Sequence, residues 1–479
     1  MNVNEAVSKA KQSHITYINT LVLFLYSGML MFDFSRYYDT TQSKLYTYLF
    51  FGMRVLFIFI CIYKIIYYFK SNSTYSLLST CLIIGTFCFH FIKAEYNFRY
   101  FFSQFTFFFN LSIVIVACYG ILFDDILRTY ITTIATLLTI RVICTFANIL
   151  PVIRHKDPVR GYMWDFGFGS HNTIFWYFVF LCLAWMYFSR RKPQKIVHSL
   201  CILLLTLFLY HFTHSQVGTI VMIIGCIGYI LIDTLINHNS KLSHILLKIF
   251  SLVSLTMPIL LLLVSILGAV YYNYYINVHG IRKVNTMFNR FRQFSIDLSL
   301  HGIHLPWEPN EMSSEIDPHT FNWLIGDVSI SQYHDNIIHN LFINYGIIIL
   351  ALFLIALTLC TFSAFINHNY YMLLIICLIT VYSTMETPAF LLGWNPFLLL
   401  AFSSHSNTIN AVLPMNSQIK STKMLTIANR KTLLLSLGAL IIDLFIFSFI
   451  YFVYHNTSFA LFVFSCFLSL IIMLYNLLR

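Results

Sequence analysis

Arginine, histidine and aspartate gather in a few polar stretches between long apolar runs, and these residue types suit chemistry on a charged, phosphorylated substrate. The first stretch, from Val159, reads VRGYMWDFGFGSHNTIFWYF and places Arg160 ahead of a glycine-rich turn. A guanidinium can grip a phosphate through its planar fork, and glycines let the backbone approach a ligand. Arg160 is therefore either a phosphate ligand or an anchor at the membrane boundary. His171 is a candidate substrate contact, and Asn172 is expected to cap the next helix.

A second polar stretch reads HFTHSQVGT over residues 211–219. His214 and Ser215 lie there in a predicted tight turn between two apolar runs, where they could hold a substrate hydroxyl. They are equally consistent with ordinary polar residues at a membrane boundary. His214 is therefore a second candidate substrate contact.

The longest polar stretch, residues 275–335, offers arginines near its start and an acid–base pair at its end. Residues 285–305 read NTMFNRFRQFSIDLSLHGIHL, and this spacing predicts an amphipathic helix on the membrane surface from which Arg290 and Arg292 project. Two nearby guanidiniums suit either a lipid pyrophosphate or simple headgroup anchoring. At the far end, His334 or Asp335 could take a proton from a sugar hydroxyl, and Asp335 is also a candidate N-cap.

Other kinds of site find little support in the sequence. The 18 histidines show no HExxH or other metal-ligand spacing, so no metal is expected. There is no Walker loop and no GxGxxG after a strand, which argues against a nucleotide site. All eleven cysteines fall inside apolar runs without a CxxC pair, which favours small buried hydrophobes over disulfides or zinc.

The elements that must position these residues are membrane-spanning helices. Of the 479 residues, 58% are hydrophobic and 10% are charged, against about 25% charged in a soluble domain. The apolar residues form runs of about 20, which cross a hydrocarbon core of roughly 30 Å as helices. We therefore predict an all-α polytopic membrane protein with about 12–14 transmembrane helices and one large extracytoplasmic loop, residues 275–335. The predicted spans include 129–151, 173–188, 196–213, 215–234, 247–274, 336–362 and 370–388.

Basic residues between the runs set the predicted orientation. The net charge is +11, and two breaks are crowded with lysine and arginine, which marks them as cytoplasmic. Both termini are then cytoplasmic, and residues 153–172 and 275–335 are outside. The predicted domains are a transmembrane core over 1–405, a basic cytoplasmic linker over 406–432 and a two-helix hairpin over 433–479. The crowded breaks hold Arg190, Arg191, Lys192 and Lys195, and Lys420, Lys423, Arg430 and Lys431.

In their order and spacing, these motifs resemble bacterial polysaccharide polymerases of the O-antigen polymerase and ligase superfamily, above all Gram-positive exopolysaccharide and capsule polymerases. The family carries an arginine followed by a GFGHPN-like turn, which resembles Arg160 and residues 167–172 without the proline. It continues with a TxSR-like turn, where this chain has residues 213–215 and then Gln216 in place of arginine. Its external loop has an arginine and an LxxxG stretch, which resembles Arg292 to Gly302. The loop ends in a DN…L…YG pattern, similar to Asp335, Asn336, Leu341, Tyr345 and Gly346.

The resemblance implies transfer of a growing glycan from undecaprenyl pyrophosphate to a sugar hydroxyl of another lipid-linked repeat unit. The reaction would take place on the outer face of the cytoplasmic membrane, without a metal or cofactor. Positive charge stabilises a departing pyrophosphate, and a base activates the acceptor. The expected partners are the lipid-linked donor and acceptor and membrane lipid, with a flippase and a chain-length regulator as candidates and no nucleic acid. The expected pyrophosphate ligands are Arg160, Arg290 and Arg292, the candidate bases are His334 and Asp335, and further substrate contacts are His171 and His214.

Three other functions remain open from the sequence. A ligase that moves finished glycan to another acceptor would share the same motifs. A flippase or transporter would more often line a cavity with ionisable residues inside its spans, and some transporters show two related halves. A non-catalytic scaffold would not need arginines in the long loop. The charged residues well within the predicted spans are Arg54, Lys64, Arg141 and Asp443, and no halves repeat.

Overall fold

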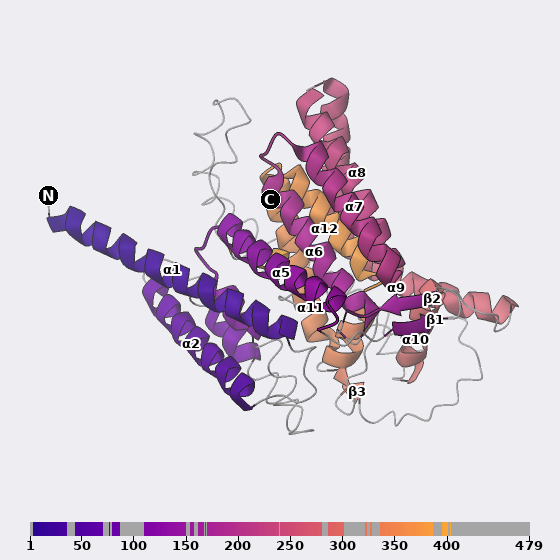
Figure 1. The fold of residues 1–479 in the computed structure, drawn as a ribbon, viewed down its shortest axis with the longest axis horizontal. Helices are drawn as coiled ribbons and strands as arrows, with labels where there is room; N and C mark the ends of the chain where they lie inside the picture. The colour runs from indigo at the N-terminus through magenta and orange to yellow at the C-terminus, as the bar shows by residue number, and fades with distance from the viewer. Residues whose placement is uncertain are drawn as a thin grey trace, which may run out of the picture. The chain divides into compact units, whose positions relative to one another are not determined.

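The computed structural model confirms the all-α class over the part of the chain that it describes (Figure 1). Among those residues, seven helices are long and apolar enough to cross a membrane, which indicates a polytopic membrane protein. Two shorter apolar helices, Ile15–Met31 and Tyr370–Ser383, accompany them. The described residues are 3–35, 44–69, 76, 79–86, 110–149, 154–157, 161–166, 168, 170–238, 240–279, 286–300, 321–322, 326–327, 336–386, 395–400 and 403.

The chain divides into two compact units, the first comprising Met1–Leu231 with Leu391–Ser406 and the second Ile232–Phe390 with Asn407–Arg479. The predicted domain boundaries near 405 and 432 fall outside the described residues. So do the linker over 406–432 and the hairpin over 433–479.

In the first unit, helix α5 (Phe123–Phe146) packs against α1 (Val3–Ser35) and α6 (His171–Ser189). Helix α2 lies beside α1 and α7 packs on α6, and Figure 1 shows the first of these pairs clearly. The short 3-10 helix η3 packs on α5. The bounds are α2 Lys44–Phe69, α7 Lys195–Thr213 and η3 Pro396–Leu399, and α8, Gln216–His238, ends in the second unit.

Helix α5 begins earlier than the predicted start at residue 129. Its first turn contains Asp124 and Asp125, which polarity alone assigns to a loop. Acidic side chains are favourable at a helix N-terminus because they meet the positive end of the helix dipole. Asp124 also pairs with Arg190 at 3.1 Å, which offsets the cost of placing a carboxylate at a span end.

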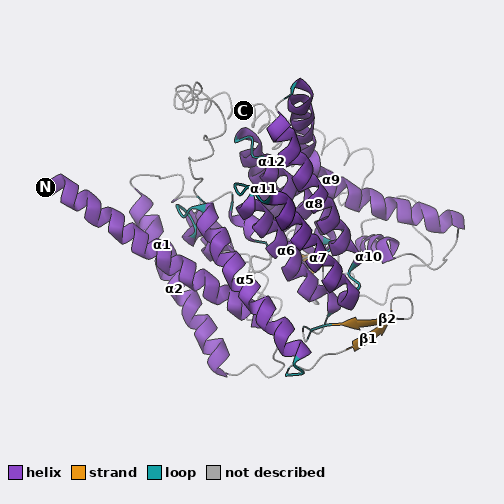
Figure 2. Ribbon diagram, turned by 45° about the horizontal axis from the view of Figure 1, so that its top comes forward, coloured by secondary structure: helices purple, strands orange, loops and turns teal. Residues whose placement is uncertain are grey.

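The predicted external stretch after α5 is not a plain loop. Strands β1 (Arg154–Asp157) and β2 (Gly161–Trp164) form an antiparallel ribbon, drawn in orange in Figure 2. Arg154 is paired with Trp164 across the ribbon, and its guanidinium carbon lies 4.9 Å from the centre of the indole. Such cross-strand contacts stabilise short strands. Arg160, which stands between the two strands in sequence, is outside the described residues.

The described part of the second unit contains, besides the end of α8, the helices α9 (Lys241–His279), α10 (Thr286–Leu300), α11 (Ile337–Ile366) and α12 (Tyr370–Ser383). Helices α9, α11 and α12 pack against one another, and α10 packs mainly on α9. The two-residue strands β3 (Phe321–Asn322) and β4 (Gly326–Asp327) pair in the long loop, and β4 contacts α11. Gly346 breaks the regular geometry of α11 with a φ of 73°, a value that strains any residue with a Cβ.

Two predicted helix caps were wrong by one or two residues. Ser170, not Asn172, caps α6: its hydroxyl accepts a hydrogen bond from the Asn172 backbone N–H at 3.4 Å. Asn336, not Asp335, caps α11, and its Oδ1 accepts from the N–H groups of Ile338 and His339. Ser and Asn are both preferred caps, so composition could not separate neighbouring candidates. Asp335 is therefore not needed to begin α11.

Candidate functional site at the junction of α10 and α11

Helix α10 uses its apolar face to pack on protein. The side chains of Phe291, Phe294 and Leu298 are buried, and they follow the spacing of one helix face. Phe291 lies directly over Gly268 of α9, where an added Cβ would come within 2.4 Å of the phenyl ring. The predicted amphipathic helix exists, but this part of its apolar face meets α9 and α11, not lipid.

Arg290 does not project from α10 as predicted. Its Nη2 lies 3.1 Å from Oε1 of Glu386, just beyond α12, and the side chains are 11% and 3% exposed. A buried ion pair repays the loss of hydration only with close geometry, and breaking it leaves an uncompensated charge. Arg290 therefore ties α10 to the end of α12.

Arg292, by contrast, has an exposed side chain, as does the adjacent Gln293. Residues two positions apart on a helix point in different directions, so Arg290 and Arg292 do not form one clamp on one face. The structure separates the two predicted ligands: one arginine is anchored within the protein, and the other is presented to the surroundings.

A buried histidine pair makes a second polar link between α10 and the spans. Nε2 of His339, in the first turn of α11, lies 2.6 Å from Oδ2 of Asp297, with side-chain exposures of 1% and 13%. The ring of Phe294 covers the imidazole at a centroid distance of 4.8 Å. His339 thus holds the second half of α10 to the start of α11.

A third link connects α10 to α9. The hydroxyl of Ser295 donates to Oδ1 of Asn273 at 2.5 Å, and both residues are buried. Nδ2 of Asn273 is buried and has no hydrogen-bond partner among the described residues. Polar contacts to α9, to α11 and to the end of α12 therefore fix α10 in one position, more tightly than apolar packing alone would.

Asn336 connects the start of α11 to two neighbours besides capping it. Its Nδ2 donates to Oγ of Ser265 and to the carbonyl oxygen of Thr384, each at 3.0 Å. Ser265 belongs to α9 and Thr384 follows α12, so one amide joins three helices. The asparagine of the DN motif is therefore a structural anchor. His334 and Asp335, the predicted base candidates, lie immediately before it in sequence and outside the described residues.

In the first unit, His214 ends α7 in the left-handed conformation, with a φ of 51°. Its backbone N–H donates to the carbonyl of Tyr210 at 2.8 Å, and its ring lies 5.7 Å from the Tyr210 ring. His171 is the first residue of α6, and its side chain is outside the described set. The predicted turn over 211–219 is thus confirmed as a helix end, and the roles of both histidines stay predictions.

Arg141 supports the glycine-rich turn in a way that sequence reasoning missed. It is fully buried in α5, its Nε donates to the carbonyl of Phe166 at 2.8 Å, and its guanidinium carbon lies 3.5 Å from the centre of the Phe168 ring. The sequence showed only a cation inside a span. A buried cation needs a hydrogen-bond acceptor, and the backbone carbonyls of the adjoining turn were the nearest candidates in sequence.

Glu386 and Asp297 were also missed as partners. Glu386 is far from Arg290 in sequence, and Asp297 is one of several acidic residues in a polar stretch. The one available signal was their position in the sequence: Glu386 stands at a span end, and Asp297 stands one residue before an apolar position of the amphipathic pattern.

Comparison with known proteins found no matching family model, no matching characterised protein and no matching solved structure.

Proposed function

We propose that this chain is a membrane glycosyltransferase that polymerises undecaprenyl-pyrophosphate-linked repeat units into a cell-surface polysaccharide on the outer face of the cytoplasmic membrane. The observation that carries the proposal is the way α10 packs on the spans. Arg290 and Asp297 are held by buried ion pairs, and Arg292 between them stays exposed beside the ends of α9 and α11. A membrane helix bundle that fixes an exposed arginine at a span end is suited to a charged lipid substrate.

Arg292 is the residue we assign to the pyrophosphate. It lies between Arg290 and Asp297, and both of these are tied to the spans, so the backbone that carries Arg292 is held in place. Positive charge positioned before the reaction stabilises a departing pyrophosphate without a reorganisation cost. Arg290 acts by holding α10, and Arg160 remains a proposed second ligand on the basis of sequence alone.

The base that activates the acceptor hydroxyl is proposed to be His334 or Asp335. Both directly precede Asn336, which fixes the start of α11 through contacts with Ser265 and Thr384. His339 is a poorer choice because its side chain is 1% exposed and is occupied by Asp297. His171 and His214 remain weaker candidates for contacts with the sugar.

Two charged residues inside the spans favour an enzyme over a flippase. Nζ of Lys64 donates to the carbonyl oxygens of Ala117 and Tyr119, at 2.5 and 2.8 Å, and Arg141 donates to Phe166. Both cations therefore donate hydrogen bonds to backbone carbonyl oxygens of neighbouring segments of the protein. A flippase would use such residues to line a substrate path, where their polar groups face a cavity.

The function is tested by deleting the gene and analysing lipid-linked glycans. A polymerase predicts accumulation of single repeat units on the lipid. Loss of externally exposed units would indicate a flippase, and accumulation of finished polymer on the lipid would indicate a ligase. Either of these outcomes would overturn the proposal.

The site is tested with Arg292→Ala in the restored gene. We expect chain growth to stop while the protein stays folded in the membrane, because the Arg292 side chain is exposed and α10 is held by other residues. Gln293→Ala, at the adjacent exposed position, is the matched control and should make polymer of normal length. Normal polymer from Arg292→Ala would remove this residue from the site.

A further inference from the structure

A group of cations and aromatic rings lies in the first unit, where α5 begins and α6 ends. Arg128 of α5 has its guanidinium carbon 5.7 Å from the centre of the Phe188 ring. Nζ of Lys192, just after α6, lies 5.8 Å from the same ring and 5.3 Å from the Trp185 ring. Both cations are exposed, while the two rings are half-buried. Two like charges from different segments therefore approach the same ring.

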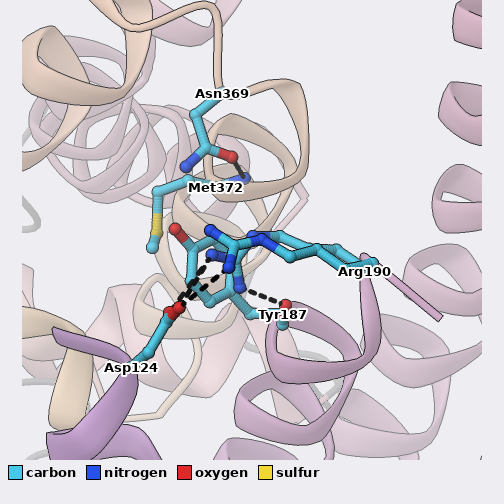
Figure 3. Close-up of polar contacts among 6 residues, drawn as sticks. Asp124, Tyr187, Arg190, Asn369 and Met372 are labelled. Carbon is cyan, nitrogen blue, oxygen red and sulfur yellow. Dashed lines mark hydrogen bonds and ion pairs between the residues drawn. The ribbon is translucent and has the colours of Figure 1, made fainter. Parts of the chain in front are cut away.

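The nearby Arg190 does not add to this free positive charge. Its Nη2 pairs with Asp124 at 3.1 Å, its Nη1 donates to the carbonyl of Tyr187, and its guanidinium lies over the Tyr187 ring (Figure 3). Arg191 also approaches Asp124, at 3.7 Å. Among the described residues, neither Arg128 nor Lys192 has an acidic partner. Asp124 thus neutralises one part of this basic region and leaves another part charged.

One of the two rings is oriented by a hydrogen bond. Nε1 of Trp185 donates to Nδ1 of His198 in α7 at 3.3 Å, which fixes the orientation of the indole. A cation over an aromatic ring is stabilised only modestly at an exposed site, whereas neighbouring like charges repel. An anion bound between Arg128 and Lys192 would remove that repulsion and accept hydrogen bonds from both.

The surroundings identify the source of that anion as lipid. Leu122, Ile196 and Leu200 adjoin the same helix ends and are 42%, 60% and 52% exposed, so this part of the protein must face hydrocarbon. Tryptophan and basic residues together are typical of the headgroup level of a membrane. A phosphate at this depth, next to exposed aliphatic side chains, belongs to a phospholipid.

We propose that Arg128 and Lys192, supported by Trp185 and Phe188, bind the phosphate of an anionic phospholipid in the leaflet that the predicted topology places on the cytoplasmic side. The guanidinium and the ammonium group contact the phosphate, and the acyl chains lie along the exposed aliphatic side chains. This site is independent of the proposed glycosyltransferase activity.

The proposal is tested on the full chain in nanodiscs of phosphatidylcholine with increasing phosphatidylglycerol, by native mass spectrometry of retained lipid. The wild type should retain phosphatidylglycerol over phosphatidylcholine, and Arg128→Gln/Lys192→Gln should weaken this retention roughly thirtyfold, at about a fivefold loss for each basic residue. Lys241→Gln/Lys248→Gln removes the same charge from exposed positions that the predicted topology places on the same side, and should change little.

Two further measurements keep the result interpretable. Lys192→Gln alone, outside the helices, should give a partial loss even if the double variant is unstable. Competition with inorganic phosphate at millimolar concentration should leave retention unchanged. Equal losses in the test and control variants would show a nonspecific charge effect, and displacement by free phosphate would show that lipid is not required. Either result would overturn the proposal.

Discussion

Two arginine–carboxylate pairs in this chain have the same closest distance but different surroundings. Arg290–Glu386 in the second unit and Arg190–Asp124 in the first both place Nη2 3.1 Å from a carboxylate oxygen. Glu386 is 3% exposed, whereas Asp124 is 25% exposed and is shared with Arg191. The same contact therefore has different consequences, because burial sets the cost of leaving one partner alone.

The difference distinguishes a buried pair that fixes the position of α10 from a partly exposed pair at the end of α6. The two arginine side chains are about equally buried, at 11% and 10% exposed, so the difference lies in the carboxylates. Glu386 is almost fully enclosed, which commits its pair to holding α10. Arg190 lies in a basic segment in which other cations remain exposed, so this region can meet mobile anions without loss of the fold. Burial of the carboxylate, more than the identity of the charged residues, distinguishes the pair that positions a site from the pair beside the proposed lipid contact.

Removing one partner of the buried pair should have the largest effect on stability. Glu386→Gln removes the carboxylate that pairs with the buried Arg290 at 3.1 Å, and we expect the free energy of unfolding to fall by about 3–5 kcal/mol. Thermal unfolding of the purified chain in detergent would measure the loss. Because α10 carries Arg292, chain growth should fall as well.

The matched control is the double variant Arg290→Met/Glu386→Leu, which replaces both charges with apolar groups. Replacing a whole buried pair is often neutral, so most of the stability lost in Glu386→Gln should return. A double variant as unstable as the single one would show that packing at these positions, not charge, makes them sensitive.

The next largest loss of stability should come from the apolar contact between α10 and α9. Gly268→Ala places a Cβ within 2.4 Å of the Phe291 ring, so this ring or the helix that carries it must move. We expect a loss of about 1–3 kcal/mol in the same unfolding assay, the usual cost of overpacking. Combining it with Phe291→Leu should recover part of the loss.

Gly52→Ala is the control for glycine replacement, because a Cβ there meets nothing within 4 Å. It should be neutral or slightly stabilising, since alanine favours a helix over glycine. If Gly268→Ala behaved like Gly52→Ala, α10 would not be closely packed on α9, and its polar contacts would hold it without that packing.

Seven of the predicted spans, and α10, are helices in the structure, because apolar periodicity repeats over many residues. It could not predict that Arg290 turns inward, since the cause, Glu386, is distant in the chain and its meeting with Arg290 depends on how α10 packs near α12. It missed Asn336 as the cap because Asp335 is an equally good cap by composition. It missed the β1–β2 ribbon because four-residue strands are too short for a clear alternation. Contacts within a helix are local, whereas the contacts that shape the candidate site join different helices.

The smallest effect should come from the more exposed pair. Asp124→Asn removes the carboxylate that Arg190 and Arg191 share. Each arginine keeps another source of stabilisation: Arg190 still contacts the ring and carbonyl oxygen of Tyr187, and Arg191 is 50% exposed to solvent. We expect a loss of about 1 kcal/mol or less in the unfolding assay, and a smaller one at high salt. In the nanodisc assay, the same variant should increase phosphatidylglycerol retention, because Arg190 and Arg191 lose their counter-ion close to Arg128 and Lys192. A loss as large as that of Glu386→Gln would contradict the comparison, since it would show that the Asp124 pair is as essential to the fold as the buried one.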